Sequence, residues 1–210
     1  MRPFVFLATI VLAPALAIAQ SLTAARAEMP PPDDLAPAIK SLLTTSAVTV
    51  TSGTTTLEFW WVKSLDAPGS GKGWERVSEG ALVGAVRVSN PYPDIRGKRM
   101  KPGVYTLRYA LQPVNGDHLG VSPFREFLLV SPAAADTAPA PAGHQGAIDL
   151  SKQTTGASHP AVWSLDPPVA DAQPLSSYEN DAGHQGIIFE IATSGGPMKF
   201  GVILIGKIEA

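Results

Sequence analysis

The chain has 210 residues, a formal net charge of −2 at pH 7 and a sequence pI near 6.1. A hydrophobic fraction of 45% excludes a wholly disordered chain, and the lack of a basic tract argues against nucleic acid as a partner. With 19 glycines, 20 prolines and only 16% charged residues, the composition disfavours a helix-rich fold, and the length suits one domain.

The N-terminus has the pattern of a secretory signal peptide. A positive charge at Arg2 precedes an apolar run over residues 4–16, and a small-residue cleavage site ends at Ala19. We expect a signal peptide over residues 1–19, with a cut after Ala27 as the alternative. The apolar run is shorter than the roughly 20 residues that cross a bilayer, so we expect a secreted or periplasmic mature chain without a transmembrane segment. Because the sequence contains no cysteine, neither disulfides nor a lipid on an N-terminal cysteine can anchor or stabilise the domain.

A spacer and one short helix are expected ahead of the strands. Residues 20–34 contain three consecutive prolines and are predicted to be a disordered spacer. Asp33 and Asp34 can cap a helix, and Pro37 is tolerated in a first turn. The apolar residues in this region are spaced as one helical face: Leu35, Ile39, Leu42 and Leu43.

Seven later segments have the composition of β-strands. They are rich in β-branched and aromatic residues, and glycine, proline, asparagine and serine separate them. Their ranges are 48–51, 57–63, 81–89, 104–112, 124–130, 186–193 and 198–208.

Two of these segments also indicate which side chains are buried. Apolar residues alternate with polar or small ones in 104–112, a period of two that predicts one buried face. The uninterrupted apolar run over 202–205 predicts a central strand that is buried on both faces. The side chains expected to share one core are Tyr105, Leu107, Tyr109, Leu111, Val202 and Leu204.

The strand pattern predicts an all-β fold. We expect a single antiparallel β-sandwich, immunoglobulin-like or jelly-roll-like, over residues 35–210. Residues 131–182 are expected to be a long Pro/Ala-rich loop excursion, after which two strands return to complete the sheets. An outer-membrane barrel is the alternative architecture, which the proline density and the short, unequal strands disfavour.

The candidate binding residues are Asp117, His118 and His159. Asn115 and Gly116 favour a two-residue turn, so Asp117 and His118 are expected at a hairpin tip, where loop residues commonly carry binding groups. An imidazole beside a carboxylate combines an acceptor with a group that titrates near neutral pH. His159 is expected to join them from the excursion.

The histidines also allow a metal site as an alternative. Two of the four lie in an identical pentapeptide, at residues 142–146 and 182–186, and neutral imidazole binds both zinc and copper. Cysteine is absent, and no two histidines have a His-x-x-x-His spacing. We therefore expect no cofactor, with a Zn or Cu site using His118 and His159 as the alternative.

Other chemical patterns are weaker. Residues 69–73 lack the first glycine and the hydroxyl side chain of a phosphate-binding loop, and no nucleophile elbow or zinc-protease motif is present. A Ser-His-Asp triad that uses His118 with Asp117 or Asp166 remains open, because only folding brings such residues together.

Exposed aromatic rings would suit a carbohydrate ligand. Trp60 and Trp61 point to opposite faces of one predicted strand, so we expect one in the core and the other exposed. Trp74 lies in a glycine-rich loop. An exposed ring could stack on a sugar, although tryptophan more often packs into the core of a secreted domain.

Several strings of the sequence occur together. They are residues 57–65, 94–97, 101–109, 112–113, 116–121, 124–129 and 159–165. In these strings the chain resembles a group of uncharacterised bacterial secreted proteins of unknown function, over about residues 35–210. The resemblance implies secretion and a β-rich fold, and it carries over no catalytic or binding residue.

These observations together predict an exported, non-enzymatic protein that binds a ligand, a glycan or another envelope protein through its loops. The alternative is a metal-binding protein or a hydrolase that uses His118 and His159. Nucleic acid is not expected as a partner.

Overall fold

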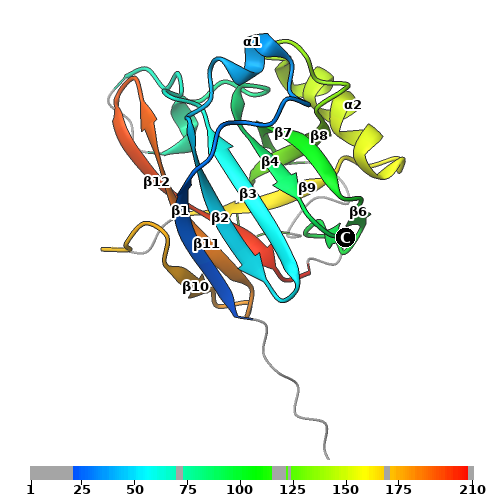
Figure 1. Cartoon of the computed structure of the whole chain (residues 1–210). Coiled ribbons are helices and arrows are strands. Elements are labelled where there is room, and N and C mark those ends of the chain that lie inside the picture. The colour runs from blue at the N-terminus through cyan, green and yellow to red at the C-terminus, as the bar shows by residue number, and fades with distance from the viewer. Residues whose placement is uncertain (1–20, 70–72, 115–121, 123, 168–170, 208–210) are drawn as a thin grey trace, which may run out of the picture.

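The computed structural model describes residues 21–69, 73–114, 122, 124–167 and 171–207. These residues form mostly strands, so the all-β expectation is confirmed. The main sheet has ten strands with antiparallel neighbours, and it curves until it nearly closes into a barrel (Figure 1). A separate small sheet pairs β5 (Tyr92–Pro93) with β6 (Arg99–Met100).

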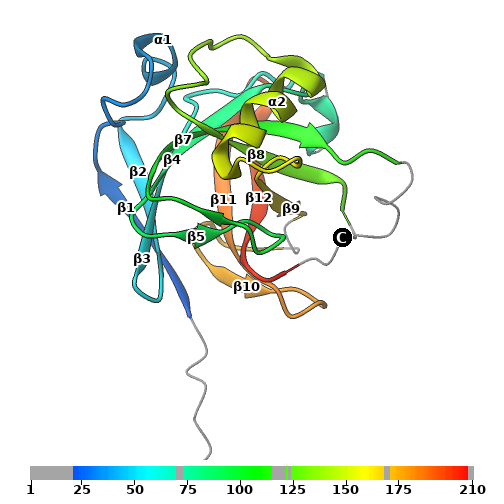
Figure 2. The same cartoon turned by 90° about the vertical axis from the view of Figure 1, so that its right-hand side faces the viewer.

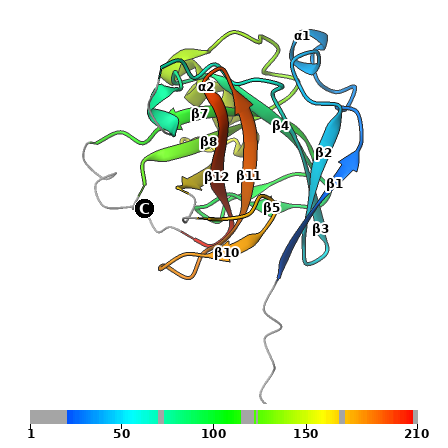
Figure 3. The same ribbon diagram turned by 90° about the vertical axis from the view of Figure 1, so that its left-hand side faces the viewer.

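The main sheet follows chain order over its first seven strands and reverses over its last three. From edge to edge the strands are β1 (Leu22–Glu28), β2 (Ser46–Ser52), β3 (Thr55–Trp61), β4 (Leu82–Val88), β7 (Gly103–Leu111), β8 (Glu126–Pro132), β9 (Val162–Asp166), β12 (Gly196–Ile205), β11 (Gln185–Thr193) and β10 (Ser177–Glu179). The edge strand β1 contacts both β10 and β11 without joining their ladder. Figure 3 shows these edges from the side, with β10 and β11 on one side of the seam and β1 and β2 on the other.

The predicted sandwich is not what the chain forms. All seven predicted strands are present, as β2, β3, β4, β7, β8, β11 and β12, but they belong to one continuous sheet. Alternation in a strand reports one buried face, and it does not reveal whether the opposing side chains come from a second sheet or from the same sheet. Here the accumulated twist and curvature bring the two ends of a single sheet together around its own core.

The interior is filled by the side chains of the sheet itself. Tyr105, Leu107 and Tyr109 point inside together with Val202 and Leu204, and Leu111 packs against them, as the alternation predicts. Eight aromatic rings form a connected network in this core: Phe59, Trp61, Trp74, Tyr92, Tyr109, Trp163, Phe189 and Phe200. The centroids of Trp61 and Phe189 are 4.8 Å apart, which is edge-to-face contact distance.

Strand β1 occupies part of the segment that was predicted to be a disordered spacer, residues 20–34. Its seven residues pair with β2, from Leu22 opposite Ser52 to Glu28 opposite Ser46. The alanine-rich sequence of β1 has little strand propensity, but an edge strand needs only backbone pairing to a neighbour that is already in place. The prediction of disorder is therefore wrong for these residues.

The predicted N-terminal helix is reduced to a single turn, α1 (Pro37–Lys40), with Pro37 in its first position. Asp33 forms an ion pair with Lys40, and no side chain caps the turn. The apolar side chains Leu35, Ile39 and Leu43 are buried as expected, whereas Leu42 is exposed. A short 3-10 helix, η1 (Trp74–Arg76), precedes β4.

The predicted loop excursion over residues 131–182 includes regular secondary structure. It contains strands β9 and β10 and the helix α2 (Gly143–Thr155), which lies across the outer side of β7 and β8 (Figure 2). The hydroxyl of Ser151 on α2 lies 2.8 Å from the carbonyl oxygens of Val130 on β8 and of Ala161 just before β9, and its shared hydrogen bond ties the helix to the sheet. No helix in the described part of the chain has the length and apolar composition of a membrane-spanning segment.

Candidate functional site

Part of the outer face of β7, β8 and β9 is apolar, although it lies outside the main core. Ala110, Leu129 and Val162 form a cluster there with Ala147 and Ile148 of α2. A second cluster of Phe127, Ile95 and Ile203 adjoins it. Strands β7, β8 and β9 therefore have the main core on their inner face, and α2 forms a partial second layer on their outer face.

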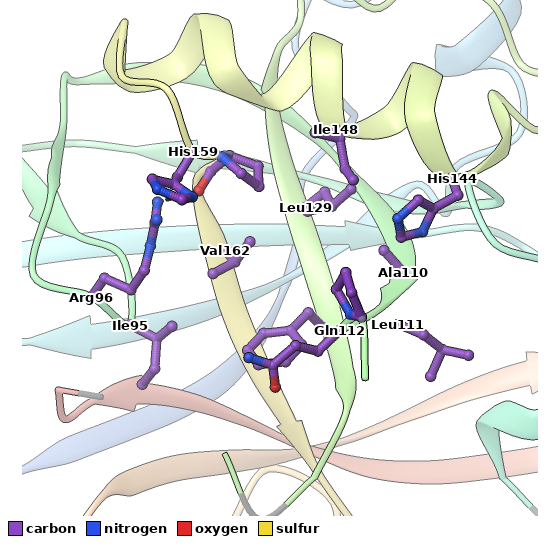
Figure 4. A pocket seen from close by; sticks show the side chains of 13 residues that line it. Ile95, Arg96, Ala110, Leu111, Gln112, Leu129, His144, Ile148, His159 and Val162 are labelled. Carbon is purple, nitrogen blue, oxygen red and sulfur yellow. Dashed lines mark hydrogen bonds between the residues drawn. The ribbon is translucent and has the colours of Figure 1, made fainter. Parts of the chain in front are cut away.

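A pocket of about 110 Å³ lies on this outer face, between α2 and the turn over residues 94–97. Its floor comes from Ala110, Phe127, Leu129 and Val162, and Ile148 of α2 forms one wall. In Figure 4, Arg96 and His159 lie at one end of the pocket, and His144 lies at the other. The site thus combines an apolar floor with nitrogen-bearing side chains at its margin.

A tight turn positions Arg96 at this margin. The buried carboxylate of Asp94 accepts hydrogen bonds from the main-chain N–H groups of Arg96 at 3.0 Å and Lys98 at 2.8 Å. Gly97 closes the turn with φ +79°, a conformation that favours glycine. The guanidinium Nη2 of Arg96 donates to the carbonyl oxygen of Pro160 and lies 3.4 Å from the Asp94 carboxylate. Ile95 is fixed by its N–H, which donates to Val162 at 2.9 Å and anchors the turn to β9.

The first turn of α2 positions His144. Its Nδ1 contacts the carboxylate of Glu79, which also accepts the N–H of Leu111 at 3.2 Å. The backbone of Gly80 approaches the helix start so closely that a Cβ atom there would lie 2.4 Å from the nitrogen of Gly143. Glycine at position 80 therefore allows the chain before β4 to hold the beginning of α2.

The structure describes only part of the predicted site. His159 is exposed at the margin of the pocket, where Arg96 and the more distant His144 accompany it. Asp117, His118 and the predicted turn at Asn115 lie outside the described residues, so a site shared with His159 stays a prediction. Within the residues that are described, no group of three or more His, Cys, Asp or Glu side chains is arranged to hold a metal ion.

The repeated pentapeptide does not build one site. Residues 142–146 begin α2, whereas residues 182–186 lead into β11. The N–H of His184 donates to the side chain of Asn180 at 3.1 Å, away from the pocket that His144 lines. The same five residues thus serve two different local structures.

The tryptophans do not provide an exposed stacking surface. All four tryptophans are buried, each with less than 10% of its surface exposed: Trp60, Trp61, Trp74 and Trp163. The expectation that one of Trp60 and Trp61 is exposed is wrong, because Trp60 on the outer face is covered by the chain around Met29. Its Nε1 donates to the Met29 carbonyl oxygen at 2.8 Å, and the guanidinium of Arg87 lies 5.7 Å from its ring centroid.

A second polar cluster surrounds Asp166 at the end of β9. Asn180 donates its side-chain N–H to the Asp166 carboxylate at 2.9 Å, and burial raises the pKa of this carboxyl. Burial also raises the pKa of the Tyr178 phenol. The ring of Tyr178 lies directly on Gly201, where a Cβ atom would come within 2.2 Å of the Tyr178 hydroxyl oxygen. This tight packing marks the cluster as part of the outer cover of the sheet.

Sequence reasoning missed Arg96 and the apolar face of α2 as components of a site, and it considered His144 only as a metal ligand. Gly156 was an available signal for the helix, since it ends α2 in the left-handed conformation typical of a helix C-terminus.

Comparison of the chain with protein-family models, with curated proteins and with solved structures gives no significant match. The chemistry of the site is therefore inferred from its geometry alone.

Proposed function

We propose that this protein is an exported binding protein, without catalytic activity of its own, that holds a small apolar group in the pocket between α2 and the sheet. One observation carries the proposal. The apolar floor formed by Ala110, Leu129 and Val162 lines a pocket on the outer face of the sheet, while the interior is filled by the chain's own aromatic side chains. A ligand therefore finds apolar surface under α2 and not inside the curved sheet.

The composition of the pocket supports a binding role. Small-molecule sites are mostly apolar with a few polar groups that orient the ligand, and this lining has that character. The floor belongs to three hydrogen-bonded strands, which keep it rigid and reduce the entropy cost of binding. A cavity of about 150 Å³ holds a benzene molecule. At about 110 Å³ with an open side, this pocket suits one small ring or a short alkyl chain.

The test is a titration with neutral probes, benzyl alcohol and toluene, followed through methyl resonances in NMR spectra. We expect saturable shifts of the methyl groups of Leu129, Ile148 and Val162, because these side chains line the pocket. Ala110→Phe places a ring on the floor and is expected to abolish the shifts.

The matched control is Ala25→Phe, on the exposed side of β1. It adds the same ring far from the pocket and is expected to leave the titration unchanged. Near-ultraviolet circular dichroism checks that both variants are folded. If Ala110→Phe does not fold, Ile148→Trp is used instead, because it fills the pocket from the helix side. Shifts that spread over the surface, or that persist in a folded, filled variant, would contradict the proposal.

Export is the second part of the proposal. We place the cut after Ala19, because β1 begins at Leu22 and all of its residues then remain in the mature chain. A cut after Ala27 would leave only Glu28 of this strand and would uncover the edge of β2. Intact mass of the secreted or periplasmic protein tests the position, and a species that retains residues 4–16 would contradict export by cleavage.

A further inference from the structure

The polar margin of the pocket points to a class of ligand. We propose that the pocket binds a small amphiphilic carboxylate, whose apolar body lies on the floor and whose carboxylate faces Arg96 and His159 (Figure 4). This inference rests on the proposed function, because it concerns the same pocket.

The charges around the pocket favour an anion. Among the described residues, no Asp or Glu lines the pocket, whereas Arg96, His144 and His159 do. The two carboxylates that contact these residues are already engaged: Glu79 with His144 and the N–H of Leu111, and the buried Asp94 within its own turn. An entering carboxylate therefore meets nitrogen groups at the margin, an arrangement of complementary charge.

Arg96 retains donor capacity that a carboxylate can use. Its Nη2 donates to Pro160 and its Nε is buried without a hydrogen-bond partner among the described residues, but the side chain is still 21% exposed and lines the pocket, so a ligand can reach part of the guanidinium. A buried donor without an acceptor is unfavourable, and a guanidinium matches the geometry of a carboxylate better than any other side chain does. Because hydrogen bonds and Asp94 hold Arg96 in its turn, little side-chain freedom is lost when an anion binds.

The His159 side of the margin adds to this preference. His159 is exposed and directly precedes Pro160, whose carbonyl oxygen accepts the hydrogen bond from Arg96. His144 is less available because it is paired with Glu79. The carboxylate is therefore placed at the Arg96 end, and a ring or short chain extends from there over Val162 and Leu129 toward Ile148. The size of the pocket, about 110 Å³, selects compact molecules of the benzoate or cyclohexanecarboxylate type over long-chain acids.

The experiment compares benzoate with benzyl alcohol, which has the same ring without the charge. Kd values are measured by methyl NMR titration for the wild-type chain, for Arg96→Gln and for the control Arg99→Gln. Arg99 is an exposed arginine on β6 that does not line this pocket. We expect benzoate to bind roughly tenfold or more tightly than benzyl alcohol, as charge-assisted hydrogen bonds allow. Arg96→Gln is expected to remove most of this preference and leave benzyl alcohol binding within about twofold.

The outcomes separate this inference from the proposed function. Equal binding of benzoate and benzyl alcohol by the wild-type chain overturns the anion preference and leaves the apolar pocket standing. A preference that survives in Arg96→Gln, or disappears equally in Arg99→Gln, also overturns it. If neither probe binds, the proposed function itself fails. Should Arg96→Gln not fold, the wild-type comparison and His159→Gln, at an exposed position, still decide the question, with a reduced benzoate preference expected in His159→Gln.

Discussion

Arg108 and Asp136 form a bidentate ion pair that is buried under the Pro/Ala-rich segment, with Nε and Nη2 of the arginine 2.6 and 2.7 Å from the two carboxylate oxygens. The remaining N–H groups of Arg108 donate to the carbonyl oxygens of Gly80, Ala138 and Ala140. Every donor of the guanidinium is used. This single side chain therefore fastens residues 136–140 to the outer face of β7, ahead of α2.

Removal of this arginine should be costly. Arg108→Met leaves the Asp136 carboxylate buried without a countercharge, and we expect a loss of about 3 to 5 kcal/mol in the free energy of unfolding. Urea titration followed by tryptophan fluorescence measures it. The double variant Arg108→Met/Asp136→Leu removes both charges and should recover part of the loss. A single variant within about 1 kcal/mol of wild type would show that the pair is not coupled to the fold.

The interior of the sheet can be tested at Leu107. Its side chain is fully buried in the core, so Leu107→Ala should cost about 2 to 5 kcal/mol. Leu42→Ala is the matched control, since Leu42 is 42% exposed and should change stability by about 0.5 kcal/mol or less. Equal effects of the two substitutions in urea titrations would mean that the buried face of β7 is assigned wrongly.

Strand β1 is expected to contribute to stability despite its alanine-rich sequence. A chain that starts at Glu28 loses the ladder to β2 and leaves Val48 and Val50 on an unpaired edge strand. We expect a lower Tm than for a chain that starts at Gln20, together with greater aggregation on heating. Thermal scans by circular dichroism and light scattering compare the two, and identical melting curves would refute a structural role for β1.

The carboxyl of Asp166 should link stability to pH. Burial raises its pKa in the folded chain, so the folded state holds this proton more tightly than the unfolded state does. The stabilisation from this group is present at low pH and is lost as the pH rises through the raised pKa. Asp166→Asn removes the titration and keeps an oxygen for Asn180. We expect the stability of the variant relative to wild type to increase between about pH 4 and pH 7 in urea titrations. A difference that does not vary with pH argues against this linkage.

Metal analysis addresses the alternative that uses His118 and His159. We expect the purified mature chain to contain no stoichiometric zinc or copper and to keep its Tm after treatment with a chelator. Stoichiometric metal that is lost in His118→Ala would instead favour a metal site and displace the non-enzymatic binding role.

The sequence was most informative where periodicity reports burial. Alternation in β7 places Leu107 and Tyr109 inside, and the apolar run of β12 reflects a central strand with Val202 inside and Ile203 outside. The curvature of the sheet could not be derived in this way, because it is a property of the whole ladder and not of any one strand. Arg108 likewise appears in the sequence as an ordinary polar position, and only the folded Pro/Ala-rich segment buries it.

The candidate site was less accessible to sequence reasoning. His144 and His184 have identical neighbours, yet the first lies in a helix and the second precedes a strand, so tertiary contacts decide between the two structures. Gly80, far away in the sequence, packs against Gly143 in the first copy of the repeated pentapeptide, residues 142–146. In the second copy, residues 182–186, Gln185 pairs with Ile205 in the ladder between β11 and β12. Arg96 becomes part of a pocket only because the turn around Asp94 docks on β9, a contact that no local pattern indicates.

The position of β12 governs when the fold can be completed. It is the last strand among the described residues but lies between β9 and β11, and it is the strand that connects β10 and β11 to the rest of the ladder. A growing chain therefore cannot complete the sheet before residues 196–205 have been synthesised. Completion of the sheet thus depends on pairing between strands that are far apart in the sequence, such as β9 and β12.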